Sequence, residues 1–309
     1  RSDRDWSSDV CSSDLVNSAF MIMTGALSIP LGLLSDRLGR RLPLLSGLLL
    51  LSGSSFLLYW SQSPLQMGCI YLIFGMGLSA ISPTLMSYVA DFTPPGALGH
   101  AFGWYTMALY GGMTLGPATG GLLGSALGLR SVFLVSGVLI LLMFFAAFFF
   151  LPTHSRQIAS SSGAVSALKS LLANQPLIAC LLATVGGCVG FGMFVSFMPL
   201  YIRELGLSTA AVGFVFATQA LVNAVSRVPA GWLYDHTSNR ALLVTAGSTA
   251  LALAMVAFGF CRSLSSLLAT AAAMGFSMGM AFTVICTLIA DSVPKKMRGL
   301  AMGCYNTSV

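Results

Sequence analysis

Residues 32–41 of the sequence combine charges and glycines in a way that suggests a specific contact. A single acid, Asp36, can accept hydrogen bonds from backbone N–H groups at the start of a helix. Gly32 lets two helices approach closely, and Gly39 permits a left-handed turn. The bases of the segment, which can pair with carboxylates or lipid phosphates, are Arg37, Arg40 and Arg41. An acid set among bases differs from a simple topology anchor, which would need only bases.

The same pattern recurs later in the chain at an almost constant separation. Pro30, Gly32, Asp36, Arg41 and Leu44 recur 199 positions later as Pro229, Gly231, Asp235, Arg240 and Leu243. Gly75, Ala90, Asp91, Pro94, Gly99, Ala101 and Gly103 recur 200 positions later as Gly275, Ala290, Asp291, Pro294, Gly299, Ala301 and Gly303. So steady a register over small and polar positions indicates an internal repeat of two similar halves.

Three polar side chains, Gln219, Asn223 and Arg227, follow one another at helical spacing within an apolar run. Residues four apart on a helix face the same way. Arg227 is the only formal charge inside a predicted membrane span and lies about 12 Å from Asp235 at 1.5 Å per residue. It either snorkels or pairs with an acid at the end of the span, or it serves a cavity or gate.

The pentapeptide Gly275 to Gly279 reads as G-x-S-x-G, the pattern around the nucleophile of many serine hydrolases. That nucleophile needs a strand-to-helix turn and a base within reach. Here Ser277 lies inside a long apolar run, and the histidines, His100, His154 and His236, fall in or beside loops. We therefore expect no enzymatic activity.

Composition identifies the class of protein that must hold these groups. Of the 309 residues, 56% are hydrophobic and 8% charged, and the mean hydropathy is +0.86. Soluble domains carry about 25% charged residues, so the chain is predicted to be an all-α integral membrane protein. The scattered basic residues form no nucleic-acid-binding patch. The seven cysteines show no metal spacing, and we expect neither a metal nor another cofactor.

Residues 1–14 differ from the rest of the chain. They are polar and nearly self-repeating, Ser7-Ser8-Asp9-Val10 being followed by Ser12-Ser13-Asp14-Leu15, and they lack the basic and apolar regions of a signal peptide. They resemble translated sequencing-adapter sequence. We expect this segment to be foreign or a disordered tail, and the native chain to start near Leu15, already within a helix.

Apolar runs of about 20 residues predict the membrane-spanning helices. The nine expected spans are residues 15–34, 42–60, 65–90, 101–126, 131–151, 175–202, 208–233, 241–261 and 264–290, and a tenth starts near Gly299. Residues 15–151 should form one helical bundle and residues 175–309 another, with 152–174 as a linker. One set of loops carries Arg37, Arg40, Arg41, Arg156, Lys169, Arg240, Lys295, Lys296 and Arg298, and the other Arg130, Arg203 and Arg262. By the positive-inside rule the first set, and with it the linker, is cytoplasmic.

The two charged loops and the internal repeat resemble the Major Facilitator Superfamily over everything after residue 14. The resemblance implies two pseudo-symmetric six-helix bundles, of which the chain holds helices two to ten and the start of helix eleven. It also implies transport by alternating access, without catalysis. The gating role that the family gives to its loop motif falls on Gly32, Asp36, Arg37, Gly39, Arg40 and Arg41, and in the degenerate second copy on Gly231, Asp235 and Arg240.

Helix five of this scheme fits the family's antiporter motif at every position. The matching residues are Gly103, Gly112, Gly116, Pro117, Gly120 and Gly121. Three of the glycines form a flat stripe on which another helix can pack, and the proline bends the helix. The resemblance thereby favours efflux. The helix-four arginine of many antiporters is replaced here by Tyr71, and the five acids after residue 14 lie at helix ends, so a proton-carrying acid would lie in the missing helices.

By the same resemblance, the residues expected to line a substrate cavity are Tyr105, Phe194, Gln219, Asn223 and Arg227. Methionine and aromatic side chains nearby suit lipophilic molecules. We expect efflux of lipophilic drugs or metabolites from a monomer in the inner cell membrane, in contact with lipid and with protons as a candidate coupling ion. The alternatives are an uptake permease for a sugar or another small organic solute and, more remotely, a non-transporting membrane sensor.

Overall fold

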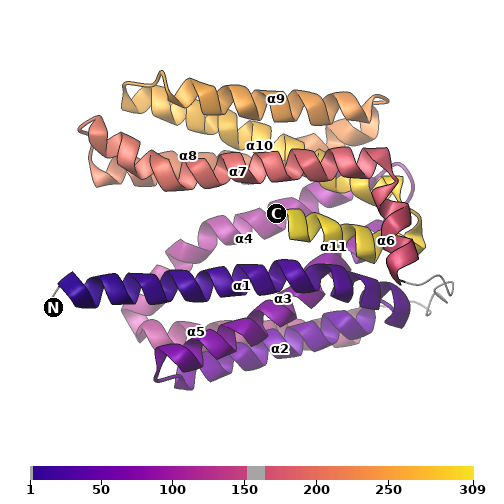
Figure 1. Ribbon diagram of the computed structural model, residues 1–309, viewed down its shortest axis with the longest axis horizontal. Helices are drawn as coiled ribbons and strands as arrows, with labels where there is room; N and C mark the ends of the chain where they lie inside the picture. The colour runs from indigo at the N-terminus through magenta and orange to yellow at the C-terminus, as the bar shows by residue number, and fades with distance from the viewer. Residues whose placement is uncertain (1–2, 152–163) are drawn as a thin grey trace. The chain divides into compact units, whose positions relative to one another are not determined.

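The computed structural model describes residues 3–151 and 164–309, and within these ranges the chain is helical, without strands (Figure 1). The N-terminal helices are α1 (Asp3–Leu38), α2 (Arg41–Trp60), α3 (Pro64–Phe92), α4 (Leu98–Leu127) and α5 (Leu129–Phe150). The others are α6 (Ala164–Leu172), α7 (Gln175–Glu204), α8 (Thr209–His236), α9 (Arg240–Phe258), α10 (Leu264–Ser292) and α11 (Arg298–Ser308), with a 3-10 turn at Lys295–Met297. This agrees with the all-α fold class predicted from the sequence.

Seven of the described helices are long and apolar enough to cross a membrane: α2, α3, α5, α7, α8, α9 and α10. Each coincides with an expected span. The remaining two expected spans fall on α1 and α4, which have 36 and 30 residues. The hydrophobic runs therefore located nine of the described helices, and seven of these have the length and apolar composition that a spanning segment needs.

Local chemistry fixes several of the helix ends. Gly39 separates α1 from α2 with a φ of 89°, a conformation that strains residues with a Cβ. The side chains of Asn174 and Asn239 accept hydrogen bonds from the first turns of α7 and α9. Ser263 and Ser266 form a reciprocal capping box at the start of α10. The turns between spans are thus specified by single residues.

Helix α1 begins at Asp3 and so includes most of the segment 1–14 that the sequence sets apart. Adding residues to a helix that has already formed costs little, so a polar segment can continue the apolar helix that follows it. The foreign origin of the segment stays a prediction. Of the expected linker 152–174, residues 152–163 lie outside the described residues, and much of the remainder forms α6.

The chain divides into two compact units, each made of separate segments. Unit 1 comprises residues 1–88, 119–168 and 294–307, and unit 2 comprises residues 89–118, 169–293 and 308–309. The start of α4 thus groups with the C-terminal helices and most of α11 with the N-terminal helices. The grouping differs from the expected boundary at residues 152–174, because these two helices pack closely on helices of the other sequence half.

In unit 1 the core lies where α2 meets α3 and α5. Leu44, Leu51, Ile81 and Tyr88 are buried there. Ser52 on α2 donates a hydrogen bond of 3.0 Å to a backbone carbonyl of α5. These contacts hold α2, α3 and α5 together, and the first charged loop leads directly into α2.

In unit 2 the core is built around α10, which packs against α7, α8 and α9 (Figure 1). Phe194, Phe258, Met274 and Phe282 belong to a single buried apolar cluster. Along α10, Gly275 and Gly279 bring its backbone against α8. This close approach places the polar face of α8 directly against α10.

Candidate functional site

In unit 1 the carboxylate of Asp36 caps the start of α11. Its Oδ1 accepts a hydrogen bond of 2.9 Å from the Gly299 N–H, and its Oδ2 accepts one of 2.8 Å from the Leu300 N–H. These are amides of the first turn of α11, which has no internal partners for them. We call this arrangement the first capping contact. Its two hydrogen bonds link Asp36 to positions that lie 263 and 264 residues further along the sequence.

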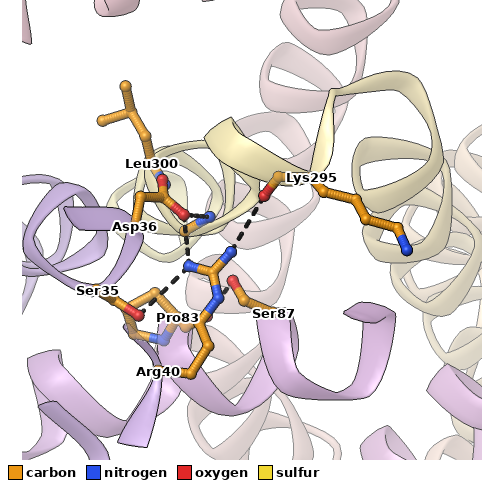
Figure 2. A network of polar contacts seen from close by, with 8 residues as sticks. Ser35, Asp36, Arg40, Pro83, Ser87, Lys295 and Leu300 are labelled. Carbon is orange, nitrogen blue, oxygen red and sulfur yellow. Dashed lines mark hydrogen bonds and ion pairs between the residues drawn. The ribbon is translucent and has the colours of Figure 1, made fainter. Parts of the chain in front are cut away.

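Arg40 completes this contact (Figure 2). Its guanidinium forms an ion pair with Asp36 and donates a 3.2 Å hydrogen bond to the carbonyl oxygen of Lys295, just before α11. Asp36 is only 8% exposed, and burial raises the pKa of this carboxyl group, while Arg40 and the amides of Gly299 and Leu300 lower it. These donors are therefore what holds a charged carboxylate at a buried position beyond the expected span.

The other residues of the first motif have different surroundings. Gly32 lies against the backbone of Gly299, where any Cβ would overlap the carbonyl group. Arg41 donates a 2.6 Å hydrogen bond to the carbonyl oxygen of Phe148 at the end of α5 and lies over the Phe148 ring. Arg37 is exposed. The three arginines are thus not equivalent, because Arg40 alone is part of the capping contact.

In unit 2 the repeated motif makes the same contact with α4. Asp235 at the end of α8 accepts hydrogen bonds of 2.7 Å from the Gly99 N–H and 2.8 Å from the His100 N–H. Gly231 lies against Gly99, again with no room for a Cβ. We call this the second capping contact. Its four residues are the repeat counterparts of Asp36, Gly299, Leu300 and Gly32.

The two copies differ in the partner of their arginine. Arg240 pairs with Asp291 of α10 and lies over the ring of Tyr234, with its Cζ 4.7 Å from the ring centroid. Tyr234 in turn donates a 3.1 Å hydrogen bond to Asp291. The second arginine therefore ties α8 and α9 to α10, whereas its repeat counterpart, Arg41, contacts Phe148 at the end of α5.

One glycine of the helix-five motif contacts a neighbouring helix in this structure. Gly103 lies against the backbone of Arg227 and Val228 on α8. A Cβ at Gly112, Gly116, Gly120 or Gly121 would meet no atom within 4 Å among the described residues. Pro117 lies inside α4, which continues through it.

Of the five residues expected to line a cavity, two meet directly in the interior of unit 2. Arg227, 1% exposed, donates a 3.0 Å hydrogen bond to Oδ1 of Asn223. Its Cζ lies 3.5 Å from the ring centroid of Tyr110 on α4. Its Nη1 lies 3.5 Å from Oγ1 of Thr283 on α10. A buried cation is thus held where α4, α8 and α10 meet.

The other three expected cavity residues, Gln219, Phe194 and Tyr105, lie in other surroundings. Gln219 is buried against α10, with its Nε2 3.6 Å from Sδ of Met278. Phe194 is 2% exposed and packs against Phe216 and Phe258, at centroid distances of 4.9 and 5.3 Å. Tyr105 is half-buried on α4. In this structure Phe194 therefore belongs to the bundle core rather than to the Arg227 cluster.

Sequence reasoning missed several partners of these groups. Gly299 and Leu300 were expected only as the start of a helix, although Gly299 repeats Gly99 in the same position after a loop. Tyr110 lies seven residues after Gly103, which places it on the same face of α4. Ser277, the hydrolase candidate, donates a 2.8 Å hydrogen bond to a carbonyl of its own helix, one turn back. Its G-x-S-x-G pattern is a feature of helix packing.

Comparisons with known proteins place the chain in a family. The family model described as Major Facilitator Superfamily matches residues 3–309. An MFS-type transporter of Methanocaldococcus jannaschii is 22% identical over 300 residues, which cover 96% of this chain and 77% of that protein. The multidrug resistance protein MdtG of Escherichia coli (strain SMS-3-5 / SECEC) is 29% identical over 244 residues, 76% of this chain. The match spans 59% of MdtG.

Two solved structures share the fold. The human organic anion transporter MFSD10 superimposes with a TM-score of 0.80 at 20% identity, covering 95% of this chain and 74% of that one. The proton:xylose symporter XylE gives a TM-score of 0.76 at 17% identity, covering 95% and 75%. These matches and the seven apolar helices show that the chain is a multi-pass membrane protein of the Major Facilitator Superfamily, a family of transporters and not of enzymes.

Proposed function

We propose that this protein moves small organic molecules across the membrane by alternating access, in the direction of efflux. The observation that supports this most is the pair of capping contacts, one in each unit and both made by the repeated motif. Each joins a helix of one sequence half to the start of a helix of the other half. Contacts of this kind are suited to form in one conformation and break in another.

The chemistry of the contacts fits a reversible role. A carboxylate that accepts two N–H bonds at a helix start gains charge-assisted hydrogen bonds and a favourable interaction with the helix dipole. When a capping contact opens, its aspartate and its helix start can hydrogen-bond to water at the predicted cytoplasmic side. The free energy of each contact is therefore a small difference between two satisfied states, which a bound substrate can shift.

Further observations support the direction of transport and the class of substrate. The helix-five glycines fit the antiporter motif, and the relative MdtG is named for multidrug resistance. Six of the fifteen buried residues in the apolar cluster of unit 2 are phenylalanine or methionine. The xylose symporter among the structural neighbours supports the second candidate, uptake of a sugar. Efflux of lipophilic molecules is the function that the sequence and the site favour together.

Everted membrane vesicles from a host that lacks its major efflux pumps would test this proposal. Efflux predicts energised accumulation of at least one of the lipophilic dyes rhodamine 6G and fluorescein in everted vesicles that contain the protein, and of neither with the Asp36→Asn/Asp235→Asn double variant. Glu204→Gln, which neutralises an exposed acid outside both motifs, is the matched control and should retain transport. Uptake of labelled xylose into right-side-out vesicles, without dye accumulation, would contradict efflux and favour the permease.

A further inference from the structure

The most unusual group in the described interior is the guanidinium of Arg227. It lies on α8, a helix long and apolar enough to span the membrane, and is 1% exposed. Charged side chains inside membrane spans are expensive to bury and commonly mark substrate or ion pathways. The location of this charge therefore calls for a functional reason.

Three helices shape the surroundings of this cation. Tyr110 of α4 stacks on the guanidinium, Asn223 of α8 accepts its hydrogen bond, and Thr283 of α10 lies at 3.5 Å. Gly103 brings α4 onto the backbone of Arg227, and Gly279 brings α10 onto Asn223. The close helix contacts thus hold the guanidinium in a fixed orientation.

The stacked ring of Tyr110 covers one face of the cation. The face of an aromatic ring is electron-rich and attracts a cation, but more weakly than a charged oxygen does in a desolvated site. A guanidinium also presents several N–H donors in a planar fork that matches carboxylate, phosphate and sulfonate groups. These donors point outward in the plane of the guanidinium, so movement of α4, which holds the ring over its face, would open space beside them.

We propose that Arg227 is the residue that binds the substrate, and that the substrate is an organic anion with an apolar body and a carboxylate, phosphate or sulfonate group. This inference rests on the proposed transport function and names its substrate class. The anion pairs with in-plane N–H donors of Arg227 when α4 separates from α8 and the Tyr110 ring leaves the face of the guanidinium. Asn223 keeps the guanidinium oriented in both states.

Two dyes that share a xanthene ring system test the proposal by fluorescence polarisation. Fluorescein is an anion at neutral pH and rhodamine 6G is a cation. The protein is placed in nanodiscs of phosphatidylcholine, so that no anionic lipid competes. We expect fluorescein to bind and Arg227→Gln to weaken its affinity at least about tenfold, because a charge-assisted pair is lost. Arg227→Lys should have an intermediate affinity.

Further variants separate binding from a structural role. Arg130→Gln removes an exposed cation outside this cluster and should leave fluorescein affinity unchanged. Tyr110→Leu removes the competing ring and should strengthen fluorescein binding, whereas Tyr110→Phe keeps the ring and should not. If Arg227→Gln fails to fold, the contrast of Tyr110→Leu with Tyr110→Phe and the affinity of Arg227→Lys decide the question.

The inference is overturned by any of three results. These are unchanged fluorescein affinity in a folded Arg227→Gln variant, tighter binding of rhodamine 6G than of fluorescein to the unaltered protein, or no binding of fluorescein together with no thermal stabilisation by benzoate or phenyl phosphate. Stabilisation by added phosphatidylglycerol but not by free anions would assign the site to a lipid headgroup and likewise overturn it. Binding of fluorescein at Arg227 without transport would instead contradict the proposed function and leave this site standing.

Discussion

Replacing Asp36 by Asn tests the first capping contact. The amide offers one acceptor oxygen in place of two and carries no charge, so it loses one N–H bond to α11 and the ion pair with Arg40. A hydrogen bond to a charged group contributes about 1.5–3 kcal/mol, and breaking a buried ion pair costs about 3–5 kcal/mol. We therefore expect the contact to weaken by about 3 kcal/mol, or roughly a hundredfold in its equilibrium constant.

Hydrogen–deuterium exchange at the start of α11 measures this change. In Asp36→Asn the amides of Gly299 and Leu300 should exchange at least about tenfold faster, because one of them loses its acceptor and the other keeps only a bond to an uncharged oxygen. Asp235→Asn is the matched control, which should accelerate exchange at Gly99 and His100 instead. If Gly299 and Leu300 exchange at the same rate in Asp36→Asn as in the unaltered protein, the reasoning is refuted.

Further predictions concern packing and topology. Gly99→Ala should destabilise the protein by several degrees in melting temperature, because a Cβ there meets the backbone of α8, whereas Gly112→Ala should be neutral because the space is open; equal melting temperatures would contradict this. Cysteine at Ser263 should react with an impermeant thiol reagent from outside the cell, and cysteine at Ser238 should not; the reverse labelling would overturn the predicted topology. Phe194→Ala should lower the free energy of unfolding by about 3–5 kcal/mol through a cavity in the core without shifting substrate preference, and a changed drug spectrum at unchanged stability would place this ring in the binding site instead.

The sequence predicted the helices well, because a spanning segment leaves a hydrophobic run that is readable without tertiary information. It also located both aspartates of the capping contacts, since the repeat at 199 and 200 positions marks Asp36 with Asp235 and Gly99 with Gly299. It could not pair them, because each contact joins residues more than 130 positions apart and belonging to different sequence halves. No local pattern encodes which helix start an aspartate reaches.

The cavity residues were harder to predict for a different physical reason. Aromatic side chains on a spanning helix can face a core, a cavity or lipid with the same hydropathy, so Phe194 could not be assigned to the core from its type. The glycine stripe of α4 likewise fits close packing without naming a partner, and its outer part is open here. Arg227 was identifiable because a charge in an apolar run is rare, but its stacking on Tyr110 depends on the register of α4 against α8.

The most direct test of alternating access through these contacts is hydrogen–deuterium exchange during transport. The protein is reconstituted in liposomes, and exchange is followed at Gly99, His100, Gly299 and Leu300 with and without a transported substrate and an energising gradient. The account predicts that both pairs of amides exchange faster while substrate is moving, because both capping contacts open in each cycle. Steady transport with unchanged exchange at all four amides would contradict it.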